Sequence, residues 1–246
     1  MHTFFASCER RRRLTLSGCV LLLCCLTAAF AAGKEDDRSP AAKASPGKQS
    51  IAHPEGVAAY CFDGDTLKLT DRRIVRIACI DAPEMAHGAA RTQYYAREAR
   101  QELIRLTERH KVRLVTVENA PKDRHGRIEA DVQREDGQSL SALMISRGAA
   151  YFYPHKNQNA AFQKKLLSLQ QHAIAQRRGF WAHLLSLPLA RGNYTGNRDS
   201  LRFFPADCPE VQHIKPRNKV YFGTLMDAFL AGYAPARICL FWPTVP

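Results

Sequence analysis

Short runs of apolar and β-branched residues alternate with polar turns in the first half of the chain. The first three runs are Val57 to Phe62, Thr66 to Thr70 and Ile74 to Ile80, and Asp-Gly-Asp and Asp-Arg-Arg turns separate them. Two similar runs follow at residues 112–118 and 127–134. Turn-bounded runs of this kind predict β-strands, so we expect five of them.

Apolar residues recur with the helical period in three further segments, residues 90–110, 139–147 and 159–178. In each, one apolar face is expected to lie on the core. Gly148 and Gly179 follow the second and third segments and suit helix ends. Phe180 and Trp181 are then expected to pack back onto the core. Five strands with interspersed helices predict an α+β fold, a small five-stranded Greek-key barrel of the oligonucleotide-binding (OB) type.

The N-terminal region has the pattern of an export signal. Four arginines, 10–13, precede the apolar run 14–32, which ends in Ala29-Phe30-Ala31. We expect residues 1–31 to be a cleaved signal peptide, with an uncleaved membrane anchor as the alternative. Residues 32–54 are polar and rich in Lys, Ser and Pro, which is typical of a disordered linker. The mature protein is therefore expected to be periplasmic or secreted, without a stable membrane partner.

The composition changes again near residue 189. The stretch 191–197 is rich in turn-forming residues and is interpreted as a linker to a small C-terminal module. The predicted organisation is a barrel domain at 55–188 and the module at 189–246. Within the module, Leu225 to Ala231 predicts a short helix that ends at Gly232.

The net charge indicates which kind of molecule the protein binds. The chain has 36 Lys and Arg against 23 Asp and Glu, a formal charge of +13. Signal cleavage would remove four arginines and one glutamate and leave +10. Such an excess favours polyanions, because basic side chains release counterions from a phosphate backbone. Non-specific contact with anionic surfaces is the alternative.

Carboxylates gather at two of the predicted turns. One turn is Asp63-Gly64-Asp65-Thr66, and the other is Asp81-Ala82-Pro83-Glu84. Hard cations such as Ca²⁺ need several oxygen ligands, and neither turn contains the Cys or His typical of zinc sites. Taken singly, each motif is also an ordinary turn.

Two arginines accompany these carboxylates. Arg76 lies inside an apolar strand, where a period of two would place it on one face with Ala78 and Ile80. Arg127 follows the polar turn that opens the last predicted strand. Forked guanidinium donors match the oxygens of a phosphodiester transition state. Together with the carboxylates they suit metal-assisted phosphodiester hydrolysis.

Three segments resemble the signature motifs of the thermonuclease (staphylococcal nuclease-like) family, in the family's order. They are Cys61-Phe62-Asp63-Gly64-Asp65-Thr66-Leu67, Val75-Arg76-Ile77-Ala78-Cys79-Ile80-Asp81-Ala82-Pro83-Glu84 and Asp123-Arg124-His125-Gly126-Arg127. The similarity covers residues 55–183. It implies an OB barrel that carries a Ca²⁺-assisted nuclease site. Enzymes of this kind cleave DNA and RNA with little sequence specificity.

The resemblance also implies roles for individual residues. By motif position, Asp65, Asp81 and the carbonyl of Ala82 would hold the ion. Glu84 would act as the general base or orient the attacking water. Arg76 and Arg127 would bind the phosphate. The family often has Thr where Ala82 stands, and a carbonyl ligand survives that change.

Further nucleic-acid contacts are expected around the third motif. Arg124 is a candidate phosphate contact, with a solvated charge as the alternative. His125 stands where the family often has an aromatic ring, and it is a candidate for base stacking or an exposed turn residue. Tyr153 is a candidate for a nucleotide pocket, because aromatic residues beside basic ones suit single strands. Tyr151 is expected to be a buried strand end.

Four cysteines remain after signal cleavage, an even number that permits disulfides in an exported chain. For Cys61 and Cys79 we favour buried thiols over a disulfide. The segment from Phe204 to Cys239 weakly resembles the small zinc-binding module of the Ada DNA-repair protein. Only two sulfurs remain there, too few for a closed zinc site, so we expect a metal-free module in which Cys208 and Cys239 either form a disulfide or remain free thiols.

The main functional hypothesis is an exported, monomeric, Ca²⁺-dependent nuclease. A catalytically inactive nucleic-acid-binding OB barrel is the first alternative, although it would be expected to lack a ligand or an arginine that this chain retains. An adhesion or scaffold domain that binds through its C-terminal module is the second.

Overall fold

The computed structural model describes residue 51 and residues 53–88, 90–108, 110–116, 122–156, 158–239 and 242–245. The predicted signal peptide lies outside these ranges, as does nearly all of the predicted linker at 32–54. Every helix in the described ranges falls short of the length and apolar character that a membrane crossing requires.

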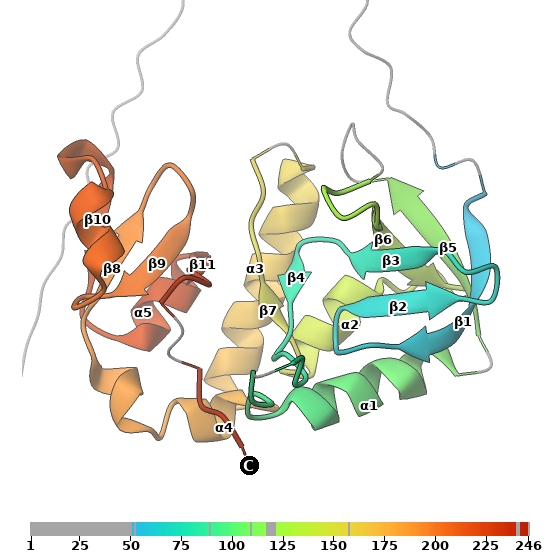
Figure 1. Cartoon of the computed structure of the whole chain (residues 1–246), viewed down its shortest axis with the longest axis horizontal. Coiled ribbons are helices and arrows are strands. Elements are labelled where there is room, and N and C mark those ends of the chain that lie inside the picture. Colours follow the sequence, from blue (N-terminus) through green and yellow to red (C-terminus); the bar gives the residue numbers. More distant parts are fainter. Residues whose placement is uncertain are drawn as a thin grey trace, which may run out of the picture. The chain divides into compact units, whose positions relative to one another are not determined.

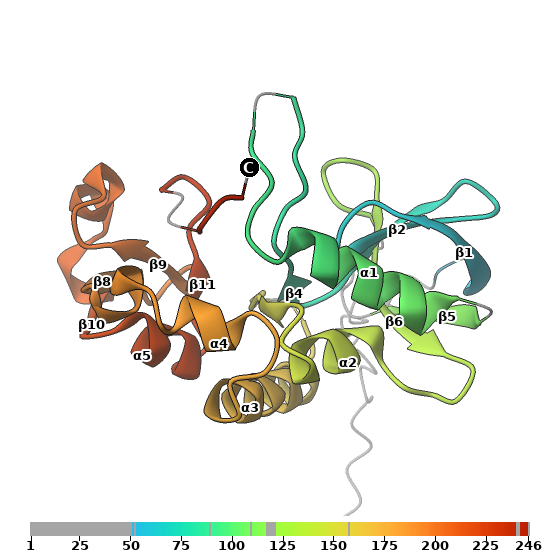
Figure 2. The same ribbon diagram turned by 90° about the horizontal axis from the view of Figure 1, so that it is seen from below.

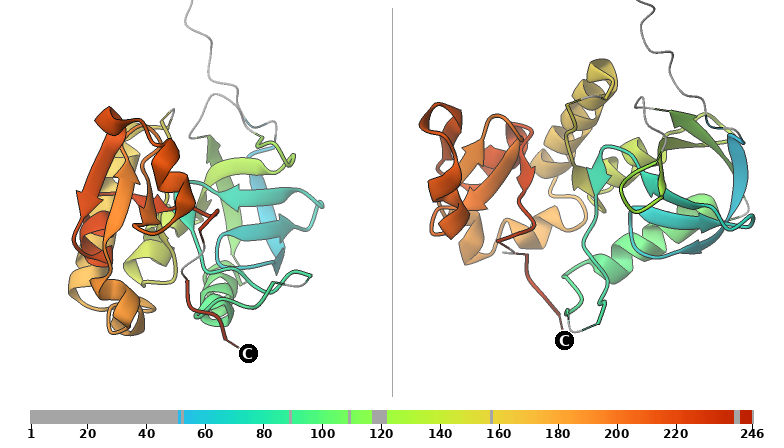
Figure 3. Two further views of the ribbon diagram at one scale, coloured as in Figure 1. Left: turned by 60° about the vertical axis from the view of Figure 1, so that its left-hand side comes forward. Right: turned by 45° about the horizontal axis from the view of Figure 1, so that its top comes forward.

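A closed five-stranded barrel forms the first part of the described structure (Figures 1 and 3). Around the barrel the strand order is β1-β2-β3-β6-β5. The β3–β6 pair is parallel, and the other neighbours are antiparallel. The strands are β1 (Glu55–Cys61), β2 (Thr66–Leu69), β3 (Ile74–Ile77), β5 (Lys111–Thr116) and β6 (Ile128–Arg134). The predicted OB-type barrel in an α+β fold is confirmed.

The third predicted strand is two strands. Its backbone turns at Ala78 and at Cys79, which has a left-handed φ of 60°. Beyond the turn, β4 (Ile80–Asp81) leaves the barrel and pairs with β7 (Tyr151–Phe152). The expectation that Arg76, Ala78 and Ile80 share one strand face is therefore wrong, since the alternation stops at this turn.

Three helices lie where the apolar periodicity predicts them. They are α1 (Ala96–Thr107), α2 (Leu140–Ser146) and α3 (Ala160–Ala175). The first two pack on strands of the barrel, and α3 lies beside α2 (Figure 2). The side chains of Ser139 and Asn159 cap α2 and α3 by accepting backbone N–H bonds of 3.3 and 3.0 Å. The first helix starts six residues later than expected, because residues 90–95 belong to a loop in which Gln93 N–H donates to Glu84 O at 2.9 Å.

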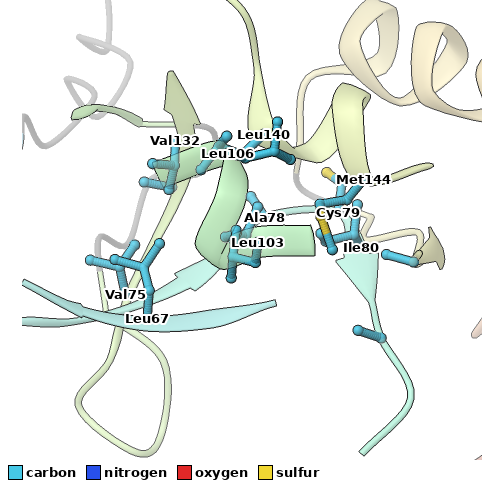
Figure 4. Packing of buried hydrophobic residues seen from close by; sticks show 14 of the residues in the cluster. Leu67, Val75, Ala78, Cys79, Ile80, Leu103, Leu106, Val132, Leu140 and Met144 are labelled. Carbon is cyan, nitrogen blue, oxygen red and sulfur yellow. The ribbon is translucent and has the colours of Figure 1, made fainter. Parts of the chain in front are cut away.

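The barrel core lies between the strands and these helices (Figure 4). Leu67 and Val75 from the strands meet Leu103 of α1 and Leu140 and Met144 of α2, and none of the five is measurably exposed. Burial of one such side chain contributes about 1.5–3 kcal/mol. The core therefore fixes the strand ends that carry the polar turns.

A second sheet, of order β10-β8-β9-β11, occupies the C-terminal part. Its strands are β8 (Tyr194–Asn197), β9 (Arg202–Pro205), β10 (Lys219–Phe222) and β11 (Ala234–Pro235). The helices around it are α4 (Trp181–Leu184), α5 (Leu225–Leu230) and the 3₁₀ turns η1 (Pro188–Arg191), η2 (Pro209–His213) and η3 (Pro216–Asn218). The linker predicted at 191–197 is thus wrong for its last four residues, which form an inner strand of this sheet. The predicted helix before Gly232 is confirmed as α5.

An aromatic cluster joins the second sheet to the end of the barrel segment. Phe180 and Trp181 are fully buried, and they pack with Phe203 and Phe229 of the C-terminal part and with Tyr151. The expectation that Phe180 and Trp181 return to the barrel core is wrong in its location, because their cluster is a separate one. The module is therefore built on a core that it shares with the barrel segment.

The four cysteines of the described ranges form one disulfide and two buried thiols. Cys208 and Cys239 form a disulfide across 31 residues. Cys61 is a buried free thiol whose sulfur contacts Thr107 Oγ1 at 3.9 Å. Cys79 is also buried, and its thiol contacts the side-chain oxygen of Gln158. The preference for buried thiols at Cys61 and Cys79 is confirmed, and of the two alternatives for Cys208 and Cys239 the structure has the disulfide.

Candidate active site

Three buried charged residues mark the candidate site. Asp65 lies just before β2, Arg76 lies in β3, and Asp81 ends β4. Their exposed fractions are 3%, 8% and 2%. Charged groups are rarely buried to this extent unless they are paired, so the contacts among these three residues determine the site.

The Asp63-Gly64-Asp65 turn builds the first side of the site. Asp63 Oδ1 accepts the backbone N–H groups of Asp65 and Thr66 at 2.9 and 2.7 Å, which fixes the turn. A Cβ at Gly64 would lie only 2.7 Å from Ala82 Cβ, so glycine is needed there. The turn therefore aims Asp65 inward, where its Oδ2 accepts the N–H of Ala82 at 2.8 Å.

Arg76 joins the two turns. Its guanidinium forms an ion pair with Asp65 and a second one with Asp81, whose Oδ1 lies 2.6 Å from Nη2. Nη2 also donates to the carbonyl of Ile80 at 3.0 Å. On the other side of Asp81, the hydroxyl of Tyr151 donates to Oδ2 at 2.6 Å. Asp65, Arg76, Asp81 and Ala82 are thus in one hydrogen-bonded cluster.

The electrostatics of the cluster reflect crowded carboxylates. Burial, with the like charges of Asp63 and Asp81, raises the pKa of Asp65 to about 8 against the attraction of Arg76. Burial alone would also raise the pKa of Asp81. Two arginines, Arg76 and Arg237, and the Tyr151 hydroxyl instead hold that pKa below its ordinary value. Asp81 is therefore an anion that its neighbours stabilise.

Glu84 stands at the rim of the same cluster. Burial, followed by the charges of Asp65 and Asp81, raises its pKa to about 7. Its backbone N–H donates to Gln93 Oε1 at 2.8 Å, which ties the turn to the 84–93 loop. The side chain is 42% exposed and borders a 330 Å³ cavity together with Asp65 and Arg76. Glu84 is thus a carboxylate that a ligand in this cavity can reach.

Arg127 also lines this 330 Å³ cavity. It precedes β6, and its Nε donates to Asp123 Oδ2 at 2.8 Å while its own backbone N–H donates to Asp123 Oδ1. Its side chain is 29% exposed. The structure therefore brings Arg76, Glu84 and Arg127 to one cavity, as the motifs predicted.

The expected nucleic-acid contacts lie around a neighbouring cavity of 310 Å³. Arg124, His125 and Tyr153 all line it. Arg124 and His125 occupy an exposed turn, where Arg124 Nε lies 3.1 Å from His125 Nε2. The Tyr153 ring is covered by the guanidinium of Arg202, 3.6 Å from the ring centre. Their contact with nucleic acid remains a prediction.

The donor set suits a hard cation. Asp65 and Asp81 offer carboxylate oxygens, and Ala82, which would offer a carbonyl, is hydrogen-bonded to Asp65. Four carboxylates interact here, those of Asp63, Asp65, Asp81 and Glu84, and a divalent cation would offset their mutual repulsion. In the described ranges, no three Asp, Glu, His or Cys side chains group as ligands. Water or substrate oxygens would have to complete the coordination.

The sequence interpretation missed one residue of the site. Arg237, from the segment after β11, forms an ion pair with Asp81 and lies 3.9 Å from Glu84 Oε1. It belongs to the predicted C-terminal module, and no local pattern connects it with a residue 156 positions away. Tyr151 was correctly expected to be buried, but the bond from its hydroxyl to Asp81 was not foreseen.

Comparison with known proteins agrees with this geometry. Residues 74–183 match the family model described as staphylococcal nuclease homologue. The chain is 33% identical over 136 residues to an uncharacterized endonuclease of Escherichia coli, which is 54% of this chain and 80% of that protein. It is 31% identical over 161 residues to the probable endonuclease LCL3 of Phaeosphaeria nodorum, 61% of this chain and 52% of that protein. The chain therefore belongs to the family of staphylococcal nuclease homologues.

Proposed function

We propose that this protein is a nuclease that hydrolyses phosphodiester bonds in DNA and RNA with little sequence specificity. The observation that carries the proposal is the single cavity bordered by Asp65, Arg76, Glu84 and Arg127. The E. coli and P. nodorum relatives are both named as endonucleases, which supports the same reaction class.

Binding of the phosphate is assigned to Arg76 and Arg127. Arg76 is held by two buried carboxylates and Arg127 by Asp123, so both guanidinium groups are positioned before a substrate arrives. Preorganised donors of this kind stabilise the charge that develops on the phosphate oxygens. Because backbone phosphates are the same in every sequence, contacts of this type carry no sequence preference.

Glu84 is assigned as the general base or as the group that orients the attacking water. It lies at the rim of the cavity, and Asp65 and Arg76 lie deeper. A carboxylate in this position can accept the proton of a water that attacks the phosphorus. Arg76 and Arg127, which line the same cavity, would then stabilise the negative charge that develops on the phosphate oxygens.

Calcium is the proposed cofactor, held by Asp65, Asp81 and the carbonyl of Ala82. When bound, the ion supplies Lewis-acid polarisation of the phosphate and lowers the pKa of a coordinated water. Side chains of the protein position the carboxylates that would hold the ion. Arg76 keeps the two carboxylates at a fixed separation, and Tyr151 fixes the second oxygen of Asp81.

We also propose that the protein is exported. The signal peptide expected at residues 1–31 would deliver the chain to the periplasm or the medium, and the Cys208–Cys239 disulfide suits such an oxidising compartment. We propose that the mature protein acts there as a monomer without a stable membrane partner, and that its barrel domain and C-terminal module divide near residue 188.

The decisive experiment is digestion of single- and double-stranded DNA and RNA in Ca²⁺, Mg²⁺ or EDTA, beside the Glu84→Gln variant. We expect cleavage in Ca²⁺, none in EDTA, and at least about a hundredfold lower kcat in the variant, the scale for loss of one positioned group. Glutamine retains the size and removes the base, so binding of an oligonucleotide should persist.

Other outcomes would reject the assignment. Undiminished turnover of Glu84→Gln would remove Glu84 from the mechanism. Tight binding of nucleic acid without cleavage under any of the metal conditions would favour the inactive nucleic-acid-binding barrel instead.

A further inference from the structure

The C-terminal segment places an arginine directly at the site. Arg237 Nη2 forms an ion pair with Asp81 Oδ1, the same oxygen that Arg76 contacts. Glu84 Oε1 lies 3.9 Å from the same nitrogen, and the Tyr153 ring centre lies 5.6 Å from the guanidinium carbon. Arg237 thus lies near both Glu84, the proposed general base, and Tyr153, the candidate for a nucleotide pocket.

This segment is fixed on both sides of Arg237. Before it, β11 pairs in parallel with β9, and the N–H of Ala236 donates to Phe203 O at 2.8 Å. Two residues after it, Cys239 is bonded to Cys208. Strand pairing and a disulfide therefore constrain the backbone that carries Arg237, which reduces the entropy lost when its side chain binds a ligand.

Arg237 differs from Arg76 in its access to ligands. The side chain of Arg76 is 10% exposed and is enclosed by the two aspartates, whereas that of Arg237 is 54% exposed. Arg237 also lines all three cavities around the site, of about 440, 330 and 310 Å³. A guanidinium has five N–H donors, so the contact with Asp81 leaves donors for an anion.

Arg237 offsets part of the negative charge that a phosphodiester would meet at this site. Within the barrel, Arg76 pairs with the buried carboxylates of Asp65 and Asp81, and Arg127 is paired with Asp123. A phosphodiester that enters the cavities adds one more negative charge beside Asp81 and Glu84. A second exposed guanidinium next to these groups lowers the electrostatic cost of that approach.

We propose that Arg237 is a third substrate-binding arginine, which donates to a non-bridging oxygen of the phosphodiester beside Asp81 and Glu84. The inference rests on the proposed nuclease function and adds to it a residue from the C-terminal module. In this arrangement the module is part of the active site, and the Cys208–Cys239 disulfide holds its contribution in position.

The test compares Arg237→Ala with Arg217→Ala, which removes the same charge from an exposed position of the same module that borders none of the three cavities. Two quantities are measured: the Kd for a fluorescein-labelled single-stranded DNA in EDTA, and kcat/KM for its cleavage in Ca²⁺. For Arg237→Ala we expect about tenfold weaker binding and a 10- to 100-fold lower kcat/KM, the range for loss of a charge-assisted hydrogen bond. Arg217→Ala should stay within about twofold of wild type in both.

Because binding and cleavage are measured separately, failure of this inference can be distinguished from failure of the proposed nuclease function. If the wild-type protein binds but does not cleave, the nuclease proposal fails, while a selective loss of affinity in Arg237→Ala still supports the contact. Wild-type affinity and rate in Arg237→Ala would overturn the inference. A faster Arg237→Ala enzyme would also overturn it, because Arg237 would then block the site.

A conservative variant keeps the test informative if Arg237→Ala misfolds. Arg237→Lys keeps the positive charge but loses the forked donor geometry, so we expect values between those of wild type and Arg237→Ala. Melting curves of all variants are recorded beside the assays. If Arg237→Ala does not fold, equal affinity of Arg237→Lys and Arg237→Gln would contradict a role for the guanidinium.

Discussion

At the scale of single residues, Asp81 connects three separate segments of the described structure. Its two carboxylate oxygens accept from Arg76, Arg237 and Tyr151, which come from β3, the C-terminal segment and β7. Removal of one partner from a buried charge pair commonly costs about 3–5 kcal/mol, because the remaining charge is left uncompensated. Substitution of Asp81 would therefore change stability and activity together, and residues at the rim are the better probes of chemistry.

Arg127 is such a rim residue. In Arg127→Lys we expect kcat/KM to fall at least about a hundredfold, because the ammonium group of lysine is a point charge and lacks the fork that fits two phosphate oxygens. The Tm should change little, since the partner Asp123 remains hydrogen-bonded to the backbone of His125. Steady-state kinetics and a melting curve check both statements, and near-normal kcat/KM would remove Arg127 from the site.

At the scale of elements, the sequence predicted the strands and helices that a local pattern of apolar and polar residues specifies. Alternating runs located the barrel strands, and apolar periodicity located α2 and α3, which the structure shows to be capped by Ser139 and Asn159. The turn at Ala78 and Cys79 was missed because its residues are as apolar as a strand and contain neither Gly nor Pro. That turn matters to the site, since it sends β4 out of the barrel and places Asp81 opposite Tyr151.

The ends of α2 and α3 meet at two glycines. Gly148 and Gly179 have φ values of 64° and 54°, and a Cβ on either would lie 2.1 Å from a backbone oxygen of the other loop. We expect Gly148→Ala or Gly179→Ala to cost about 2–4 kcal/mol, from the left-handed backbone and the clash together. Gly137 has a similar φ of 78°, but a Cβ there would meet open space. Gly137→Ala should therefore lower the free energy of unfolding by only about 1–2 kcal/mol.

Urea unfolding of the three glycine variants measures these differences. Equal losses of free energy in all three would show that the close approach of the two loops contributes nothing beyond the backbone conformation. A larger loss at Gly148 and Gly179 would support the packing of the two helix ends.

At the scale of the whole described structure, motif order predicted which residues gather at the candidate site but not all that surrounds them. Asp65, Arg76, Asp81, Glu84 and Arg127 come together because they lie on neighbouring strands and turns of one barrel, and their catalytic and metal-binding roles stay predictions. Arg237 joins them through a tertiary contact across 156 residues, which leaves no local periodicity or spacing to detect. The second sheet was underestimated for the same reason, since its core is completed by Tyr151, Phe180 and Trp181 from the barrel segment.

The Cys208–Cys239 disulfide should contribute to the stability of this arrangement. Closure of a loop of 31 residues is worth about 3–4 kcal/mol in the chain-entropy description. We therefore expect the Cys208→Ser/Cys239→Ser double variant to melt roughly 6–15 °C below wild type. Differential scanning calorimetry measures the shift, and an unchanged Tm would show that the second sheet is stable without its disulfide.

The shared aromatic cluster also limits how this chain can be divided. Residues 55–188 contain all three signature motifs, yet a fragment ending there would leave Tyr151, Phe180 and Trp181 without Phe203, Phe229 and Trp242 as neighbours. A contiguous aromatic surface of that kind promotes association between molecules. The smallest useful version of this enzyme, for engineering or for expression in quantity, is therefore the barrel together with the C-terminal sheet, and the two have to be redesigned as a pair.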